Sequence, residues 1–148
     1  MNQLDEFRAA SRRYSDTSML MHEAIARRAG LSGTDHKYLG LMVAKGPMTA
    51  GELAQLTGLT GGAITGLIDR LEEKKLARRE YDTEDRRKVY IVADSAAVLK
   101  LMTPIFKDLQ KKTANLLMSY SDSEIRIIKK YMEEAVVVMN EALKNLKN

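Results

Sequence analysis

The sequence predicts a mainly α-helical fold with one small β-hairpin, and three observations lead to this prediction. Apolar residues recur at helical spacing over both ends of the 148-residue chain. Six of the nine glycines fall between Gly46 and Gly66, which divides the middle of the chain into short elements. Residues 77–92 then alternate in part between apolar and polar side chains, as paired strands do.

The first part of the chain is predicted to form two helices. Apolar residues recur at roughly helical spacing over 4–29, and Gly30 interrupts that pattern. Thr34 can cap a second helix, because a threonine hydroxyl accepts a hydrogen bond from a backbone N–H of the first turn. This helix is expected to continue to about Lys45, where Gly46-Pro47 ends it.

Two shorter helices are predicted next, separated by Gly58. Thr49 caps the first, and Glu52, three residues later, completes a capping box. Thr60 opens the second helix, which is expected to continue to about Lys75. One face of this second helix is apolar and should pack against the core. Its residues are Ile64, Leu67, Ile68 and Leu71.

The remainder of the chain is predicted to contain a β-hairpin and two long helices. The segments 77–81 and 88–92 are the strands, and the polar stretch 82–87 joins them. Pro104 lies well inside the first long helix, so we expect either a kink there or a helix that begins later. A second capping box, Ser121 with Glu124, precedes the last helix.

Two short helices followed directly by a charged hairpin make a winged helix-turn-helix plan. Ala54 is small enough to let the second helix approach, and Gly58 supplies the backbone freedom that the sharp turn needs. Ile64 and Leu67 anchor the second helix, so its far side faces outward. The alternative is an αα-hairpin that only packs, and the adjoining hairpin favours the winged plan.

Three segments resemble the MarR (multiple antibiotic resistance regulator) family. They are Gly46-Pro47-Met48-Thr49-Ala50-Gly51-Glu52-Leu53-Ala54, then Ile68-Asp69-Arg70-Leu71-Glu72, then Asp82-Thr83-Glu84-Asp85-Arg86-Arg87. The order of helices resembles that family from end to end, and the hairpin segment is the most specific part. The resemblance implies an obligate dimer with six helices per chain. It also implies interlocked terminal helices and two winged lobes that straddle a pseudo-palindromic DNA site.

We expect residues 1–148 to form a single domain with two regions. Residues 35–94 form the winged helix-turn-helix lobe, and 1–34 with 95–148 form a helical dimerisation region. The last helix carries Val136–Val138 beside its main apolar stripe, so its apolar surface is wide for a chain of this size. We therefore expect a homodimer, in agreement with the resemblance. An intramolecular bundle is the alternative.

The outward face of the second short helix is predicted to enter a major groove of double-stranded DNA. We expect Thr60 and Thr65 to make contacts near the helix start and Arg70 to bind a phosphate. The face itself consists of Gly62, Gly66, Asp69 and Glu73, with Glu73 beyond the contact. Glycines let the backbone approach DNA but offer few side chains for reading bases. Specificity should therefore depend on the wing and on DNA shape. The glycines depart from the serine-rich helix start common in the family, which puts direct base readout in doubt.

The hairpin tip carries the second predicted contact. By resemblance, either Arg86 or Arg87 enters the minor groove, while Asp85 pairs with an arginine and stabilises the wing. A solvated charged loop is the alternative, and the sequence does not decide which arginine inserts. Together the candidate DNA-binding residues are Thr49, Thr60, Gly61, Gly62, Thr65, Arg70, Arg86, Arg87 and Lys88.

Charge and composition limit the other possibilities. The net charge is +4, but residues 35–94 hold ten basic and ten acidic residues, so basicity does not single out the DNA-binding lobe. The absence of cysteine excludes disulfides and thiolate metal sites. There is no secretory signal pattern and no apolar run near the ~18 residues of a membrane span. We expect a cytoplasmic protein.

No pattern for catalysis is present, so we expect no enzyme activity and no cofactor. His22 and His36 are the only histidines, and without a third ligand at short spacing we expect no metal site. Met21, Tyr38 and Met42 are candidates for a pocket that binds a small effector such as an aromatic acid, with core packing as the alternative. The other class of function is a winged-helix protein-interaction module that does not bind DNA.

Overall fold

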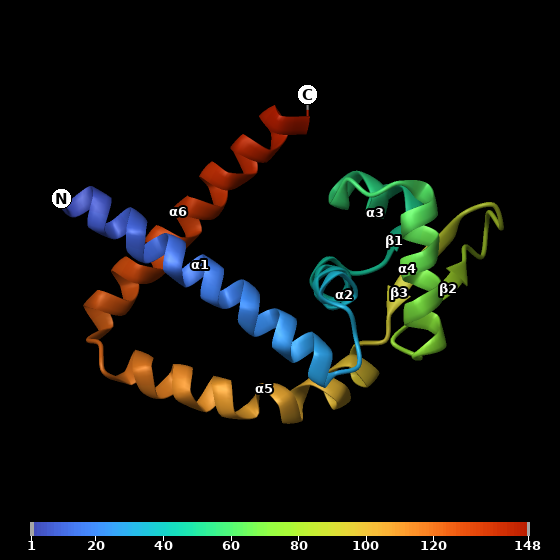
Figure 1. Cartoon of the computed structure of the whole chain (residues 1–148). Helices are drawn as coiled ribbons and strands as arrows, with labels where there is room; N and C mark the ends of the chain where they lie inside the picture. The colour runs from blue at the N-terminus through green and yellow to red at the C-terminus, as the bar shows by residue number, and fades with distance from the viewer. Residues whose placement is uncertain (1, 148) are drawn as a thin grey trace. The chain divides into compact units, whose positions relative to one another are not determined.

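The computed structural model describes residues 2–147 and is mainly helical, with one small antiparallel sheet (Figure 1). The helices and strands follow one another as α1 (Gln3–Arg28), α2 (Gly33–Lys45), β1 (Met48–Thr49), α3 (Ala50–Thr57), α4 (Gly61–Glu73), β2 (Ala77–Tyr81), β3 (Val89–Ala93), α5 (Ser95–Met118) and α6 (Asp122–Lys147). The predicted mainly α fold with a β-hairpin wing is confirmed.

The sheet has the strand order β1-β3-β2, and both pairings are antiparallel. In the hairpin, Arg79 lies opposite Ile91 and Tyr81 lies opposite Val89. The sequence does not indicate β1, because two residues are too few to show alternation. Its residue Met48 pairs with Ile91, so β1 ties the chain before α3 to the base of the wing.

The ends of the short helices have the predicted chemistry. The Thr49 backbone N–H donates to Glu52 Oε2 over 2.8 Å, and the Glu52 N–H donates to Thr49 Oγ1 over 3.1 Å, which completes the capping box. Gly58 ends α3 with φ 75°, a left-handed conformation that favours glycine. The Thr60 hydroxyl caps α4 by accepting from the Ala63 N–H.

One predicted helix start differs from the structure, and one alternative for a second helix is excluded. Ser32, and not Thr34, caps α2, and its Oγ accepts from the Asp35 N–H over 3.0 Å. The helix therefore includes Gly33, where a Cβ would collide with the carboxylate of Glu23. α5 begins at Ser95 and continues through Pro104, so the alternative of a later start is wrong.

The core of the winged lobe forms around the apolar face of α4. The four residues predicted for this face are all buried. They are Ile64, Leu67, Ile68 and Leu71. Leu53 of α3, Leu39 of α2 and Ile91 of β3 are buried as well. Because one face of α4 is held by this core, its other face is turned outward.

The chain divides into two compact units, one ending at Phe106 and the other beginning at Lys107. The second unit contains the end of α5 and the whole of α6, and α6 buries none of its described side chains. Many of its exposed side chains are large and apolar. They include Ile127, Met132, Val136, Val137, Val138, Met139 and Leu143. Among residues 2–147, no helix is both long and apolar enough to cross a membrane.

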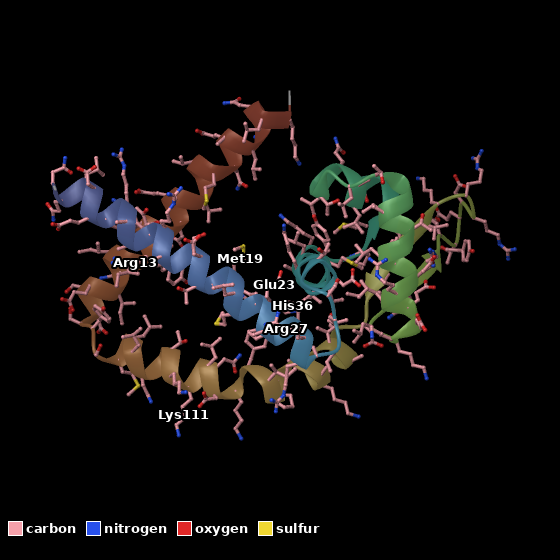
Figure 2. The ribbon with its side chains drawn as sticks, viewed as in Figure 1. Arg13, Met19, Glu23, Arg27, His36 and Lys111 are labelled. Atoms are coloured by element: carbon pink, nitrogen blue, oxygen red, sulfur yellow. The ribbon has the colours of Figure 1, made fainter. Side chains whose placement is uncertain are left out.

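The two histidines meet where α1 packs on α2. His22 Nδ1 of α1 lies 3.4 Å from His36 Nε2 of α2, and the ring of Phe106 lies 6.4 Å from each imidazole between ring centres. Figure 2 shows His36 beside α1, close to Glu23. Burial lowers the pKa of His36, and repulsion from a protonated His22 lowers it further.

This pKa shift predicts a pH-dependent stability. Because the pKa of His36 is lower in the folded chain, the unfolded chain takes up the proton first as the pH falls below about 6.5. The free energy of unfolding should therefore decrease as the pH falls from the pKa of His36 in the unfolded chain toward its lower pKa in the folded chain. Urea unfolding between about pH 7.5 and about pH 5 measures this. His36→Gln should flatten the dependence relative to wild type, and equal slopes in the two proteins would contradict it.

Candidate nucleic-acid interface

The outward face of α4 is open and carries few side chains. Gly61, Gly62, Thr65 and Asp69 are exposed on it. A Cβ built at Gly61 or Gly62 would meet no atom within 4 Å, so the backbone of the first turn borders open space. The absence of side chains at these two positions lets another molecule approach the α4 backbone closely. The glycine-rich surface expected from the sequence is therefore present.

The three candidate threonines differ in what their hydroxyls can do. Thr49 Oγ1 and Thr60 Oγ1 accept hydrogen bonds from backbone N–H groups at the starts of α3 and α4. Each of these hydroxyls keeps its own hydrogen for donation to an anionic oxygen such as a phosphate. The hydroxyl of Thr65 instead donates to the carbonyl of Gly61 over 3.1 Å. In this rotamer Thr65 can offer only acceptor lone pairs to DNA.

Arg70 joins the buried side of the lobe to the outward face of α4. Its Nε and Nη2 donate to the two carboxylate oxygens of Asp35, both over 2.8 Å. The Asp35 side chain is only 4% exposed, whereas that of Arg70 is 53% exposed. The hydrogen bonds to Asp35 raise the pKa of Arg70. The phosphate contact predicted for Arg70 stays a prediction, and the structure adds a second role in linking α4 to α2.

Gly66 makes room for this ion pair. A Cβ at residue 66 would lie 3.2 Å from Nη1 of Arg70, one turn further along α4. A side chain here would press on the guanidinium that holds Asp35. Gly66 is predicted from the sequence to lie on the outward face of α4, and the structure adds that a side chain here would crowd Arg70.

A second guanidinium links α4 to the wing. Arg79 of β2 donates from Nη2 to Asp69 Oδ1 over 2.8 Å and from Nη1 to Glu72 Oε2 over 2.9 Å. Its backbone N–H also donates to Glu72 Oε1 over 2.9 Å. The bond to Asp69, followed by the charge of Glu72, raises the pKa of Arg79. Arg79 is not among the residues predicted from the sequence, although the spacing of Asp69 and Glu72 places both carboxylates along one side of α4.

Carboxylates shape the tip of the wing. The side chain of Asp82 accepts from the N–H groups of Asp85 and Glu84, and these bonds lower the pKa of Asp82. Asp85 accepts from both the guanidinium and the backbone N–H of Arg87, which lowers its pKa in turn. The arginine that pairs with Asp85 is therefore Arg87.

Basic side chains extend from this tip. Arg86, Arg87 and Lys88 are all exposed, and the side chain of Arg87 is 91% exposed although it pairs with Asp85. Among the described residues the Arg86 side chain has no hydrogen-bond or ion-pair partner. The two wing arginines therefore differ in how readily they could bind a phosphate. Arg87 would have to break or share its ion pair with Asp85, whereas Arg86 would not.

The candidate effector residues lie on α1 and α2, which pack against each other. Tyr38 and Met42 of α2 are buried in the hydrophobic core, and Met21 of α1 is half-buried. A ligand pocket beside them stays a prediction.

The structure brings α4 and the wing together as one surface. Strand β2 packs against α4, and Arg79 joins them (Figure 1). Residues 35–94 hold equal numbers of acidic and basic residues, but ion pairs within the lobe engage some of the acidic ones. Asp69 and Glu72 are paired with Arg79, and Asp85 is paired with Arg87. These three carboxylates therefore repel an approaching phosphate less than unpaired groups would.

Comparison with known proteins places this surface in a family. A family model described as MarR family matches residues 29–88. The chain is 38% identical over 136 residues to the uncharacterized HTH-type transcriptional regulator YcgE of Bacillus subtilis, covering 92% of this chain and 88% of that protein. It is 26% identical over 121 residues to the HTH-type transcriptional regulator MhqR of the same organism, covering 82% of each.

Solved structures agree on the fold. A MarR family protein from Bacillus stearothermophilus superimposes with a TM-score of 0.75 at 22% identity, over 95% of this chain and 99% of that one. The transcriptional regulator Tm0710 from Thermotoga maritima gives 0.66 at 21% identity, over 95% and 98%. The segments that resembled the family in sequence form the α3, α4 and wing elements of that fold. The chain belongs to the MarR family of winged helix-turn-helix, DNA-binding transcriptional regulators.

Proposed function

We propose that the protein is a homodimeric repressor that recognises a pseudo-palindromic site in duplex DNA and responds to a small ligand. The observation that carries the proposal is the joint surface of α4 and the wing, in which an open helix face and a basic hairpin tip are held together. An α-helix fits a major groove, and an arginine at a hairpin tip fits the adjacent minor groove. A dimer would present two such surfaces to two half-sites.

The contacts follow from the side chains present. The hydroxyls of Thr49 and Thr60 and the open backbone at Gly61 and Gly62 suit phosphates and close approach. Few base-reading side chains stand on α4, so we propose that sequence preference comes largely from groove shape sensed by the wing. Arg86, Arg87 and Lys88 are the basic groups available for this.

Removing either wing arginine should weaken DNA binding with little change in stability. Arg86→Ala and Arg87→Ala remove exposed side chains, so urea midpoints should stay near that of wild type. Fluorescence anisotropy with duplex DNA from upstream of its own coding sequence measures the affinity. Lys100→Ala, an equal loss of charge on an exposed part of α5, is the control.

The salt dependence of the same affinity separates phosphate contact from other effects. The slope of log affinity against log salt should be steep in wild type and should fall by about 0.9 for each phosphate contact that a variant loses. Unchanged affinity in both wing variants would exclude the wing from the interface. A flat salt response in wild type would argue against the proposed binding of duplex DNA.

The homodimer is supported by the exposed apolar side chains of α6. Sedimentation at micromolar concentration should give about twice the chain mass of 16.6 kDa. Met139→Glu places a charge on the exposed apolar surface and should shift the protein toward monomer, since burying an unpaired carboxylate in an interface is costly. Asn140→Glu adds the same charge at a polar position and should leave the dimer intact. A monomeric wild-type protein would contradict the proposal.

The small ligand would bind beside α1 and α2, which pack against each other and carry Met21, Tyr38 and Met42. A ligand that binds only the folded chain raises its melting temperature by mass action. A panel of aromatic acids should therefore include compounds that raise the melting temperature and weaken DNA binding. No shift with any of them would count against an effector of this class.

A further inference from the structure

We propose that Arg79 is a positioning residue for DNA recognition, which sets the wing at a fixed angle to α4 without contacting DNA itself. The inference rests on the proposed function, because it concerns how the two parts of the DNA-binding surface are kept in register. It adds a residue that lies outside the predicted contact set and that belongs to the first strand of the wing.

The bonding of Arg79 is directed inward to α4. Both terminal nitrogens donate to carboxylates of α4, one to Asp69 and one to Glu72, and the backbone N–H donates to Glu72 as well. The side chain is only 30% exposed. Three hydrogen bonds from one residue to two positions one turn apart restrict both sliding and rotation of β2 against the helix. No other arginine on the strand does this.

Because Arg79 lies in β2 before the turn, a small rotation of the strand at Arg79 becomes a larger displacement at the tip of the hairpin. About three residues of strand separate Arg79 from the start of the turn at Asp82, which is roughly 10 Å at ~3.3 Å per residue. A rotation of about 10° at Arg79 would displace the tip by roughly 2 Å, enough to break a hydrogen bond. Arg86 and Arg87 would then no longer lie in register with the face of α4.

Arg79 also controls a carboxylate on the surface that approaches DNA. Asp69 is 60% exposed on the outward face of α4. Released from Arg79, it would present an unpaired negative charge to the phosphates. Paired, it is turned toward the wing. The two effects of Arg79 act in the same direction, because both disappear when the guanidinium is lost.

The neighbouring arginine provides a matched control. Arg78 precedes Arg79 on β2 and points to the other side of the strand, as alternation requires. It donates to Glu80 on its own strand over 2.7 Å, and its side chain is 54% exposed. Arg78→Gln and Arg79→Gln remove the same charge from adjacent positions of the wing. They differ in whether α4 loses its link to β2.

The experiment compares the two variants in selectivity for DNA. A preferred duplex is first selected from a random pool with the wild-type protein, and a scrambled duplex of equal composition is the reference. Relative to Arg78→Gln, Arg79→Gln should lose about tenfold in preference for the selected duplex, comparable to one mismatched base pair. Circular dichroism confirms that each protein is folded at the temperature of measurement.

A double-mutant cycle tests whether the effect runs through α4. Glu72→Gln should lower selectivity when it is made in the wild-type protein and have little further effect in Arg79→Gln.

If Arg79→Gln does not fold, Asp69→Asn replaces it, with Glu80→Gln as the control of equal charge. Asp69→Asn leaves both bonds between Arg79 and Glu72 in place, and it should still lower selectivity relative to Glu80→Gln.

Two results would overturn the inference while leaving the proposed function intact. One is equal selectivity in Arg79→Gln and Arg78→Gln. The other is an equally large effect of Glu72→Gln in wild type and in Arg79→Gln, which would mean that Arg79 does not act through α4. If wild-type protein enriches no sequence from the pool, the proposed sequence-specific binding fails and this inference fails with it.

Discussion

The winged lobe depends on the ion pair between Asp35 and Arg70. The Asp35 carboxylate is 4% exposed and needs hydrogen-bond partners, which the Nε and Nη2 of Arg70 supply. The partner comes from α4, which is proposed to face DNA, so the apolar packing of α4 and its ion pair with α2 act together. Because Arg70 is half-exposed, the pair also connects the inside of the lobe with the outward face of α4.

Local chemistry made much of this fold predictable. Thr49, Thr60 and Gly58 act on backbone groups within three or four residues of themselves, so their roles follow from the sequence alone. The partners of Arg70 and Arg79 lie 35, 10 and 7 residues away, and no local pattern joins them. The cap of α2 is local as well, since Ser32 accepts from the Asp35 N–H three residues later, and the prediction placed the cap at Thr34 instead.

The charge of the lobe illustrates why composition is a poor guide to its function. Equal numbers of acidic and basic residues suggested an electrically neutral surface. In the structure, several carboxylates form ion pairs with guanidinium groups or accept hydrogen bonds from backbone N–H groups of the wing turn. Arg86 extends from the tip without an ion-pair partner among the described residues, whereas the charge of Lys88 helps to lower the pKa of Asp82. Attraction to phosphate therefore depends on which charges are paired, and less on their sum.

The open first turn of α4 has a consequence for helix stability. Glycine is a weak helix former, and Gly61 and Gly62 stand together as the first two residues of α4, at the end that would face DNA. The Thr60 cap is thus the main local support of that turn. Contact with a phosphate backbone would supply stabilisation that the residues themselves do not, so ordering of this turn is expected to be coupled to the arrival of DNA. Part of the selectivity would then depend on how well a given DNA sequence stabilises the first turn of α4.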